Sequence, residues 1–150
     1  MKQIPLTDGK TYTTVNDSIF GFLSQFKWYL DKGNYVYTHI NSKKIRLHRM
    51  LMLAEPGQEI DHIDGNPLNN LTNNLRLCTR AENQRNRALH KNNTSGFKGV
   101  VRHFNKWRAQ VRVNGKLRYF GIFSDKTQAA RAYNEAVRKL FGNFARENDI

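Results

Sequence analysis

Residues 60–86 carry the sequence IDHIDGNPLNNLTNNLRLCTRAENQRN, and its turn, strand and helix signals decide the fold around it. Residues 64–67, Asp-Gly-Asn-Pro, predict a tight turn, because glycine tolerates positive φ and Asx side chains bond to their own backbone. Residues 74–78 predict a brief strand, and Thr79 with Glu82 forms a capping box that predicts the start of a helix. The expected order is strand end, turn, strand, helix.

The same stretch holds side chains suited to hydrolysing a phosphodiester, a reaction that needs a base to activate water and a hard cation to absorb charge. His62 is the candidate base. Asp61 and Asn83 are oxygen donors of the kind that hold Mg²⁺ through few protein ligands. The capping box places Asn83 in the first turn of its helix, near backbone donors that favour phosphate. Asn74 is placed to brace the loop that carries His62.

These residues resemble the HNH, or ββα-metal, endonucleases, especially the phage and intron-encoded homing group that begins Asp-His-Ile-Asp-Gly-Asn, over about residues 47–87. The resemblance implies that Asp61 and Asn83 bind a divalent metal, Mg²⁺ or alternatively Mn²⁺. It also implies a catalytic pair, with His62 as the general base and Asn74 as the structural middle member of the motif. The alternative is an Asn-rich structural loop, which leaves the capped Asn83 unexplained.

Four further side chains near this motif are candidates for DNA contact. His48 lies where similar enzymes carry a His-Arg pair that contacts phosphate, although a packed histidine on a short helix at 48–53 explains it equally well. Arg80, Arg85 and Arg87 are expected either to meet the DNA backbone or to form a solvated helix face. Upstream, residues 35–40 and 43–47 alternate around Asn-Ser and predict a hairpin.

Residues 97–150 predict a three-stranded antiparallel sheet packed on one helix. Residues 107–113 alternate strictly, Asn114-Gly115 is the strongest short hairpin signal, and residues 116–122 therefore return antiparallel. Residues 99–104 supply the third strand. An amphipathic helix follows, with Ser124 as its expected cap and Gly142 as its end. The sheet face opposite the helix carries the arginines.

Residues 96–146 resemble the plant Apetala-two/ethylene-response-factor DNA-binding domain through segments 96–100, 106–113, 119–123 and 129–134. That resemblance implies that the sheet lies in the major groove. A two-residue loop pairs Val113 with Lys116 and so places Tyr119 opposite Gln110. Val101 and Leu117 replace basic residues of the plant family, so its base preferences do not transfer; the alternative is a merely soluble sheet surface. The implied contact residues are Lys98, His103, Arg108, Gln110, Arg112 and Tyr119.

Composition points to a polyanionic partner. The 150 residues include 25 Lys and Arg against 12 Asp and Glu, a formal net charge of +13, and residues 92–150 alone carry twelve basic and four acidic side chains. Double-stranded DNA is the expected partner, with a solvated surface as the alternative. Cys78, the single cysteine, excludes an internal disulfide and a structural zinc knuckle. No signal peptide or membrane-spanning run is present, so we expect a cytoplasmic protein, in a bacterial host if it is phage-encoded.

The sequence therefore predicts an α+β chain with an HNH ββα-metal endonuclease domain at 1–90, whose core is 47–90 and lead-in 1–46. A linker at 91–96 and a DNA-binding domain at 97–150 follow. We expect no membrane partner and no small-molecule cofactor, and a monomer or weak dimer. A single set of catalytic groups makes nicking the default reaction for a monomer. The alternative function is a sequence-specific DNA-binding regulator whose HNH part is structural.

Overall fold

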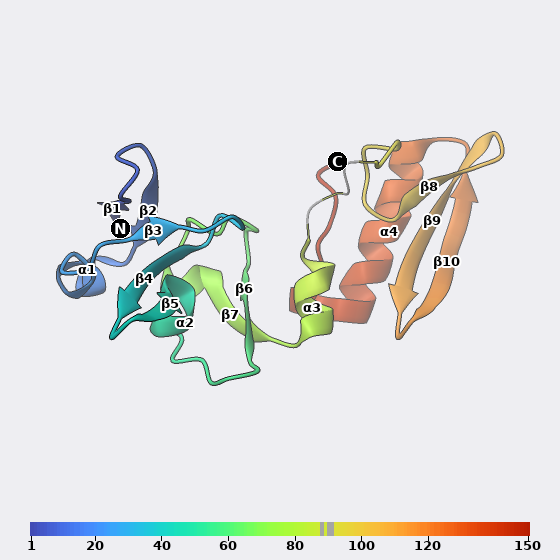
Figure 1. The fold of residues 1–150 in the computed structure, drawn as a ribbon. Helices are drawn as coiled ribbons and strands as arrows, with labels where there is room; N and C mark the ends of the chain where they lie inside the picture. The colour runs from blue at the N-terminus through green and yellow to red at the C-terminus, as the bar shows by residue number, and fades with distance from the viewer. Residues whose placement is uncertain (88, 90–91) are drawn as a thin grey trace. The chain divides into compact units, whose positions relative to one another are not determined.

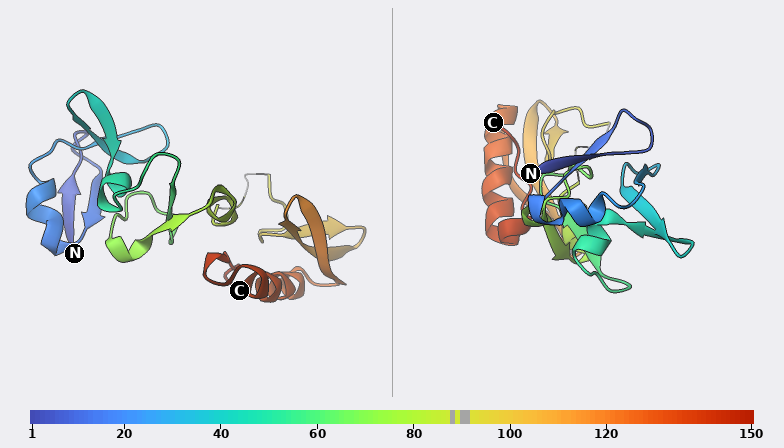
Figure 2. Two further views of the ribbon diagram at one scale, coloured as in Figure 1. Left: turned by 90° about the horizontal axis from the view of Figure 1, so that it is seen from below. Right: turned by 90° about the vertical axis from the view of Figure 1, so that its left-hand side faces the viewer.

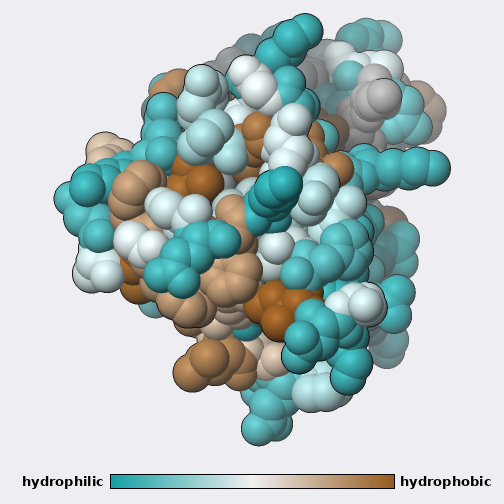
Figure 3. All heavy atoms as spheres, turned by 60° about the vertical axis from the view of Figure 1, so that its left-hand side comes forward, coloured by the Kyte–Doolittle hydropathy of each residue, from teal (hydrophilic) through white to brown (hydrophobic). Residues whose placement is uncertain are grey.

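The computed structural model describes residues 1–87, 89 and 92–150, and it confirms a mixed α+β chain. The chain forms two compact units, Met1–Asn83 and Gln84–Ile150 (Figure 1). Each has its own buried apolar cluster. The face in Figure 3 is mostly hydrophilic, with hydrophobic side chains in several separate areas. In the described part of the chain, no helix is both long and apolar enough to cross a membrane.

The N-terminal unit begins with strands that the sequence analysis did not predict. Strand β1 (Lys2–Pro5) pairs antiparallel with β2 (Tyr12–Val15), and helix α1 (Asp17–Leu23) follows. A second sheet has the order β3-β4-β5, from β3 (Tyr29–Leu30), β4 (Val36–Ile40) and β5 (Lys43–Arg46). Helix α2 (Leu47–Leu51) continues directly from β5. The core beneath these elements is formed by Leu23, Trp28, Val15, Val36 and Leu47.

The predicted hairpin at 35–47 is confirmed. Ile40 pairs with Lys43 across a two-residue turn, in which Asn41 and Ser42 have φ of 48° and 63°. Positive φ at both central positions matches a type I′ turn, whose twist suits the flanking strands.

The central stretch folds in the predicted order. Strand β6 (Glu59–His62) pairs antiparallel with β7 (Leu75–Cys78), and helix α3 (Arg80–Arg85) follows. The short 3-10 helix η1 (Thr72–Asn74) leads into β7. The capping box is present: Thr79 N donates to Glu82 Oε2 at 2.8 Å, and Glu82 N donates to Thr79 Oγ1 at 3.3 Å. Gly65 has φ of 74° in the turn between the strands.

The C-terminal unit is a three-stranded antiparallel sheet with one long helix along one face (Figures 1 and 2). The sheet order is β10-β9-β8, from β8 (Val100–His103), β9 (Lys106–Val113) and β10 (Lys116–Phe123). Helix α4 (Lys126–Phe141) and the 3-10 helix η2 (Gly142–Phe144) follow. Val100, Ala109 and Val111 of the sheet are buried in one cluster with Ala129, Tyr133 and Val137 of α4.

The predicted register holds, because Val113 pairs with Lys116 and Tyr119 with Gln110. A register shift then places Ile122 opposite Arg108. Gly121, with φ of 115°, lies in this bulge. The extra residue reverses the alternation of β10, so Ile122 joins Tyr119 on the sheet face away from α4.

The predicted helix cap was wrong by one residue. Asp125, rather than Ser124, is the N-cap of α4, and its Oδ2 accepts a hydrogen bond from Gln128 N at 2.9 Å. Helical backbone begins at Lys126, so the extended residue directly before it, Asp125, has the N-cap position, where its carboxylate also interacts favourably with the helix dipole. The predicted end at Gly142 is confirmed.

The division between the units precedes the linker predicted at 91–96, whose first residue, Lys91, lies outside the described residues. The backbone after Asn83 is bound within the C-terminal unit. Lys98 Nζ donates to the carbonyl oxygens of Arg85 and Arg87, and Arg146 Nη1 donates to Asn86 O at 2.5 Å. Ser95 is buried and its hydroxyl donates to Val100 O at 2.8 Å, so the end of the predicted linker is also folded.

Candidate active site

Strand β6 presents Glu59 and Asp61 on one face, and Ile60 and His62 on the other, because side chains alternate along a strand. Asp61 lies opposite Arg76 of β7 in the register. Its Oδ2 accepts hydrogen bonds from Arg76 Nε at 2.9 Å and from Nη2 at 2.6 Å. The exposed fractions of the Asp61 and Arg76 side chains are 6% and 16%. This buried ion pair fixes the carboxylate in place.

Asn83 reaches the same face of β6 from the first turn of α3. Its Nδ2 donates to Glu59 Oε2 at 2.7 Å, which orients the side-chain amide. Glu59 was not predicted, although its position two residues before Asp61 places both carboxylates on one strand face. Cys78 is half-buried, and burial together with the charges of Asp61, Glu59 and Glu82 raises the pKa of its thiol to about 11. The thiol is therefore protonated at neutral pH.

Oxygen atoms of this face fit a hard divalent ion by their chemistry. Asp61 and Glu59 carry carboxylates and Asn83 carries an amide oxygen, all of which suit Mg²⁺. Within residues 1–87, 89 and 92–150, no group of three His, Cys, Asp or Glu residues is placed to hold a metal. A metal ion on this face would therefore need the amide oxygen of Asn83 in addition to the carboxylates of Asp61 and Glu59. Arg76 already pairs with Asp61 Oδ2, so a cation bound there would share this oxygen with the guanidinium.

His62 lies on the opposite face of β6, in a buried aromatic environment. Its exposed fraction is 5%, its ring lies 5.2 Å from that of His48 and 6.1 Å from that of Tyr35, and Nε2 is 3.3 Å from Asn70 Oδ1. Burial lowers the pKa of His62, although the hydrogen bond to Asn70 and the nearby aspartates oppose this effect. The imidazole is therefore neutral at neutral pH, which is the form that accepts a proton.

The structure places His48 against His62 rather than on an exposed surface. Its exposed fraction is 6%, and Tyr35 lies edge-on to it at 5.2 Å. Burial, helped by His62, Arg46 and Arg49, lowers the pKa of His48 to about 3. These observations favour a packed histidine over a phosphate contact.

Asn74 braces the loop between β6 and β7. Its Oδ1 accepts from Asp64 N at 3.1 Å, and its Nδ2 donates to Asp64 Oδ1 at 3.0 Å and to Asn69 O at 2.8 Å. Its own carbonyl accepts from Ile63 N at 2.9 Å. One buried amide thus joins the turn after His62 to the start of β7.

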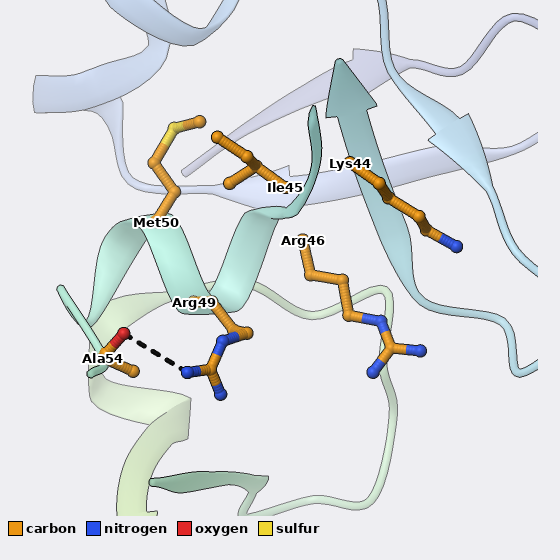
Figure 4. A pocket seen from close by; sticks show the side chains of 6 residues that line it. All are labelled: Lys44, Ile45, Arg46, Arg49, Met50 and Ala54. Atoms are coloured by element: carbon orange, nitrogen blue, oxygen red, sulfur yellow. Dashed lines mark hydrogen bonds between the residues drawn. The ribbon is translucent and has the colours of Figure 1, made fainter. Parts of the chain in front are cut away.

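A pocket of about 450 Å³ lies beside α2 in the N-terminal unit. Figure 4 shows the guanidinium groups of Arg46 and Arg49 on one side of α2 and Met50 on the other. Arg49 donates to the carbonyl oxygens of Ala54, Glu55 and Gln58, and so braces the loop before β6. None of the residues assigned to the chemistry lines this pocket.

Asp31 binds two of the basic side chains that line this pocket, Lys44 and Arg46. It accepts hydrogen bonds from Lys44 at 3.2 Å and from Arg46 at 3.0 Å. Burial alone would raise the pKa of its carboxyl, but hydrogen bonds from Tyr35 N, Lys44, Arg46 and Gly33 N lower it to about 2.

The open face of the C-terminal sheet brings several predicted contact residues together. Arg108 Nη2 donates to Gln110 Oε1 at 3.1 Å, and its guanidinium lies 4.5 Å from the centre of the Tyr119 ring. Arg112 is exposed and donates to Gly115 O at 2.7 Å. His103 is half-buried and packs edge-on against Phe104. Large apolar side chains are also exposed on this face, namely Leu117, Tyr119 and Ile122.

Other predicted contact residues have structural partners. Lys98 holds the carbonyls after α3, and burial, together with Arg146, lowers its pKa to about 8. The guanidinium of Arg85 lies 4.2 Å from the ring centre of Phe141. Arg80 and Arg87 are exposed, as expected for either a DNA contact or a solvated helix face.

A neutral imidazole that can accept a proton, with oxygen donors suited to a hard cation on the opposite face of the same strand, supplies the two kinds of group that phosphodiester hydrolysis requires. The model of the family described as HNH endonuclease matches residues 47–85, close to the span of the predicted resemblance. An uncharacterized HNH endonuclease of Acanthamoeba polyphaga mimivirus is 35% identical over 147 residues, covering 93% of this chain and 76% of the relative. The chain belongs to the HNH endonuclease family and is a nuclease that acts on DNA.

A second relative is protein 3.8 of Escherichia phage T7, which is 41% identical over 92 residues, covering 60% of this chain and 75% of the relative. No solved structure matches the chain. The mimivirus alignment covers more than the N-terminal unit can supply, so it also extends into the C-terminal unit. The likeness of residues 96–146 to the ethylene-response-factor domain stays a prediction.

Proposed function

We propose that the chain is a metal-dependent DNA endonuclease in which His62 is the general base and Asp61 and Asn83 are metal ligands. The observation that carries this proposal is the neutral, buried imidazole of His62, adjacent along β6 to a carboxylate held in place by Arg76. Asn74 keeps the connecting loop in shape through its bonds to Asp64 and Asn69. Mg²⁺ or Mn²⁺, when bound, would supply positive charge for the phosphate and the leaving oxygen.

The step assigned to this chain is a proton transfer. His62 takes one proton from water while the water oxygen forms a bond to phosphorus. The bond between phosphorus and the leaving ester oxygen breaks, and that oxygen takes a proton from solvent. General base catalysis of this kind contributes about 10²- to 10⁴-fold in rate.

We propose that the open face of the C-terminal sheet binds double-stranded DNA in the major groove. Support comes from the cluster of Arg108, Gln110 and Arg112 on one face, since arginine pairs bidentately with guanine and glutamine with adenine. The exposed apolar side chains beside them suit contact with thymine methyl groups. The viral sources of both relatives support a viral or phage origin, and we propose in addition, from the resemblance of residues 60–66 to the homing group, an enzyme of the homing type.

Nicking of supercoiled plasmid in Mg²⁺ or Mn²⁺ tests the catalytic assignment. We expect His62→Ala to lose about 10²-fold or more of the rate. His39→Ala is the matched control, because His39 is exposed on β4 and should not affect cleavage. A protein that binds DNA but loses no cleavage activity in His62→Ala would refute the assignment and leave the DNA-binding regulator as the better account.

A further inference from the structure

In a neutral histidine, a hydrogen bond at one ring nitrogen determines which of the two nitrogens carries the proton. The His62 ring has such a contact with the side chain of Asn70. We infer that Asn70 is a positioning residue that holds His62 in its Nε2–H tautomer, and that Thr13 of β2 fixes the orientation of Asn70. This inference deepens the proposed function and rests on it for the role of His62 in cleavage. The tautomer itself can be measured without any cleavage reaction.

Asn70 is completely buried, with an exposed fraction of 0%. Its side chain has three partners: Nδ2 donates to Thr13 Oγ1 at 2.9 Å and to Pro67 O at 3.1 Å, and Oδ1 lies 3.3 Å from His62 Nε2. A backbone carbonyl only accepts hydrogen bonds, so the group that faces Pro67 O must be the NH₂ group.

The contact of Asn70 with Thr13 requires the same orientation of the Asn70 amide as the contact with Pro67 O does. The Thr13 hydroxyl has one proton, which it donates to Leu68 O at 2.9 Å. Thr13 Oγ1 must therefore accept, rather than donate, in its contact with Asn70. Two separate acceptors thus require the same orientation of the Asn70 amide, and its carbonyl oxygen faces His62.

The protonation of His62 follows from this orientation. An amide oxygen cannot donate, so Nε2 must carry the hydrogen for the contact with Asn70 to be a hydrogen bond. In a neutral imidazole the other nitrogen, Nδ1, is then the unprotonated one. Nδ1 is therefore the nitrogen that accepts the proton from water.

Three further hydrogen bonds join the hairpin of β1 and β2 to the loop that carries Asn70. Thr14 N donates to Leu68 O and Asn70 N donates to Thr14 O, both at 2.9 Å, while Thr72 N donates to Asn16 Oδ1 at 2.9 Å. Strand β2 and the residue that follows it therefore support the loop that carries Asn70. The lead-in at 1–46, which had no assigned role from the sequence, contributes to the catalytic residue through this contact.

Side-chain ¹⁵N chemical shifts of His62 at neutral pH, in the full chain without added metal, test the inference. We expect the Nε2–H tautomer to dominate in the native protein and in Thr14→Val, the matched control, since Thr14 points to the opposite face of β2. Asn70→Leu should shift the population toward Nδ1–H, and Thr13→Val should do so to a smaller extent. Thermal unfolding followed by circular dichroism identifies which variants fold.

Plasmid nicking by the same variants supplies the functional readout. Loss of a group that orients a catalytic side chain lowers activity about 10- to 100-fold, so we expect this loss in kcat of Asn70→Leu, with KM for DNA unchanged. If Asn70→Leu does not fold, Thr13→Val decides. An unchanged His62 tautomer in the folded variants overturns the inference, whereas a changed tautomer with cleavage unaffected by His62→Ala overturns the proposed function instead.

Discussion

Arg76 and Asp61 show how one buried ion pair shapes the candidate metal site. The pair satisfies a carboxylate that would otherwise be costly to bury, yet it holds the oxygen that a metal ion would use. Breaking the pair would therefore be costly for folding, and a metal ion bound at Asp61 would have to share this carboxylate with Arg76. The same carboxylate oxygens thus take part in the packing of the unit and in the proposed metal site.

Removal of Arg76 is expected to destabilise the protein strongly. Arg76→Ala leaves the Asp61 carboxylate buried, and breaking a buried pair in this way costs about 3 to 5 kcal/mol. Urea unfolding of the full chain measures this loss. Arg138→Ala is the control, because its pair with Glu147 is exposed and screened by solvent and should contribute little. Equal losses in the two variants would show that the Arg76 pair is not effectively buried.

His48 should make stability depend on pH. The folded-state pKa of about 3 lies below the ordinary value of 6.5, so the unfolded state binds the proton more tightly. The stabilisation is complete above pH 6.5 and decreases as the pH falls toward 3. His62 and the cations of Arg46 and Arg49 disfavour protonation, whereas Asp31 favours it.

The measurement compares the free energy of unfolding at pH 7.5 and 4.5 in native protein and in His48→Phe, which keeps an aromatic ring at this position. One such histidine accounts for about 1.4 kcal/mol per pH unit below 6.5, and pH 4.5 lies two units below that value, so the native protein should lose about 3 kcal/mol more than the variant. His39→Phe should behave like the native protein. The same pH dependence in all three proteins would contradict a buried neutral His48.

The positioning role inferred for Asn70 could not be predicted from the local sequence. Asn70 lies in a stretch with many asparagines, and nothing local separates it from its neighbours. Its importance arises from burial and from Thr13, which is distant in sequence. By contrast, the roles predicted for Asp61, His62 and Asn83 came from fixed spacing around a turn and a helix cap, which are local signals.

Elements with strong local signals were predicted accurately. Asn114-Gly115 and the turn at 64–67 have residues that favour positive φ. The hairpin at Asn114-Gly115 formed in the predicted register, and the turn at 64–67 lies between strands in the predicted order. Strands β1 and β2 were missed because they are short, and their partner contacts depend on tertiary packing. The division between the units was also misplaced, since the bonds from Lys98 and Arg146 to backbone carbonyls are long-range.

The start of α4 gives a direct test at the level of an element. Asp125→Ala removes the side chain that accepts from Gln128 N and should cost about 1 kcal/mol in the free energy of unfolding. Ser124→Ala should cost little, because Ser124 is not the cap. Urea unfolding monitored by helical circular dichroism compares the two variants. A larger loss in Ser124→Ala would restore the cap predicted from sequence.

Positive charge is distributed unevenly along the chain. Residues 92–150 carry most of the positive excess, while the proposed chemistry belongs to the N-terminal unit. A tethered binding surface raises the local concentration of DNA at a nuclease that binds weakly on its own. Affinity and cleavage should therefore respond to different substitutions.

Arg112 tests this separation, because it is exposed on the open sheet face and belongs to the C-terminal unit. Arg112→Ala should weaken binding to a duplex enriched from a random library by about 1 to 3 kcal/mol, since one base-contacting arginine contributes that much. Cleavage at saturating DNA should be unchanged. Arg131→Ala, which removes an exposed arginine from α4, is the matched control and should bind like the native protein at the same salt concentration. If Arg112→Ala keeps both its affinity and its site preference in a gel-shift titration, the sheet does not read the DNA, and the selection of the cleavage site must reside in the N-terminal unit.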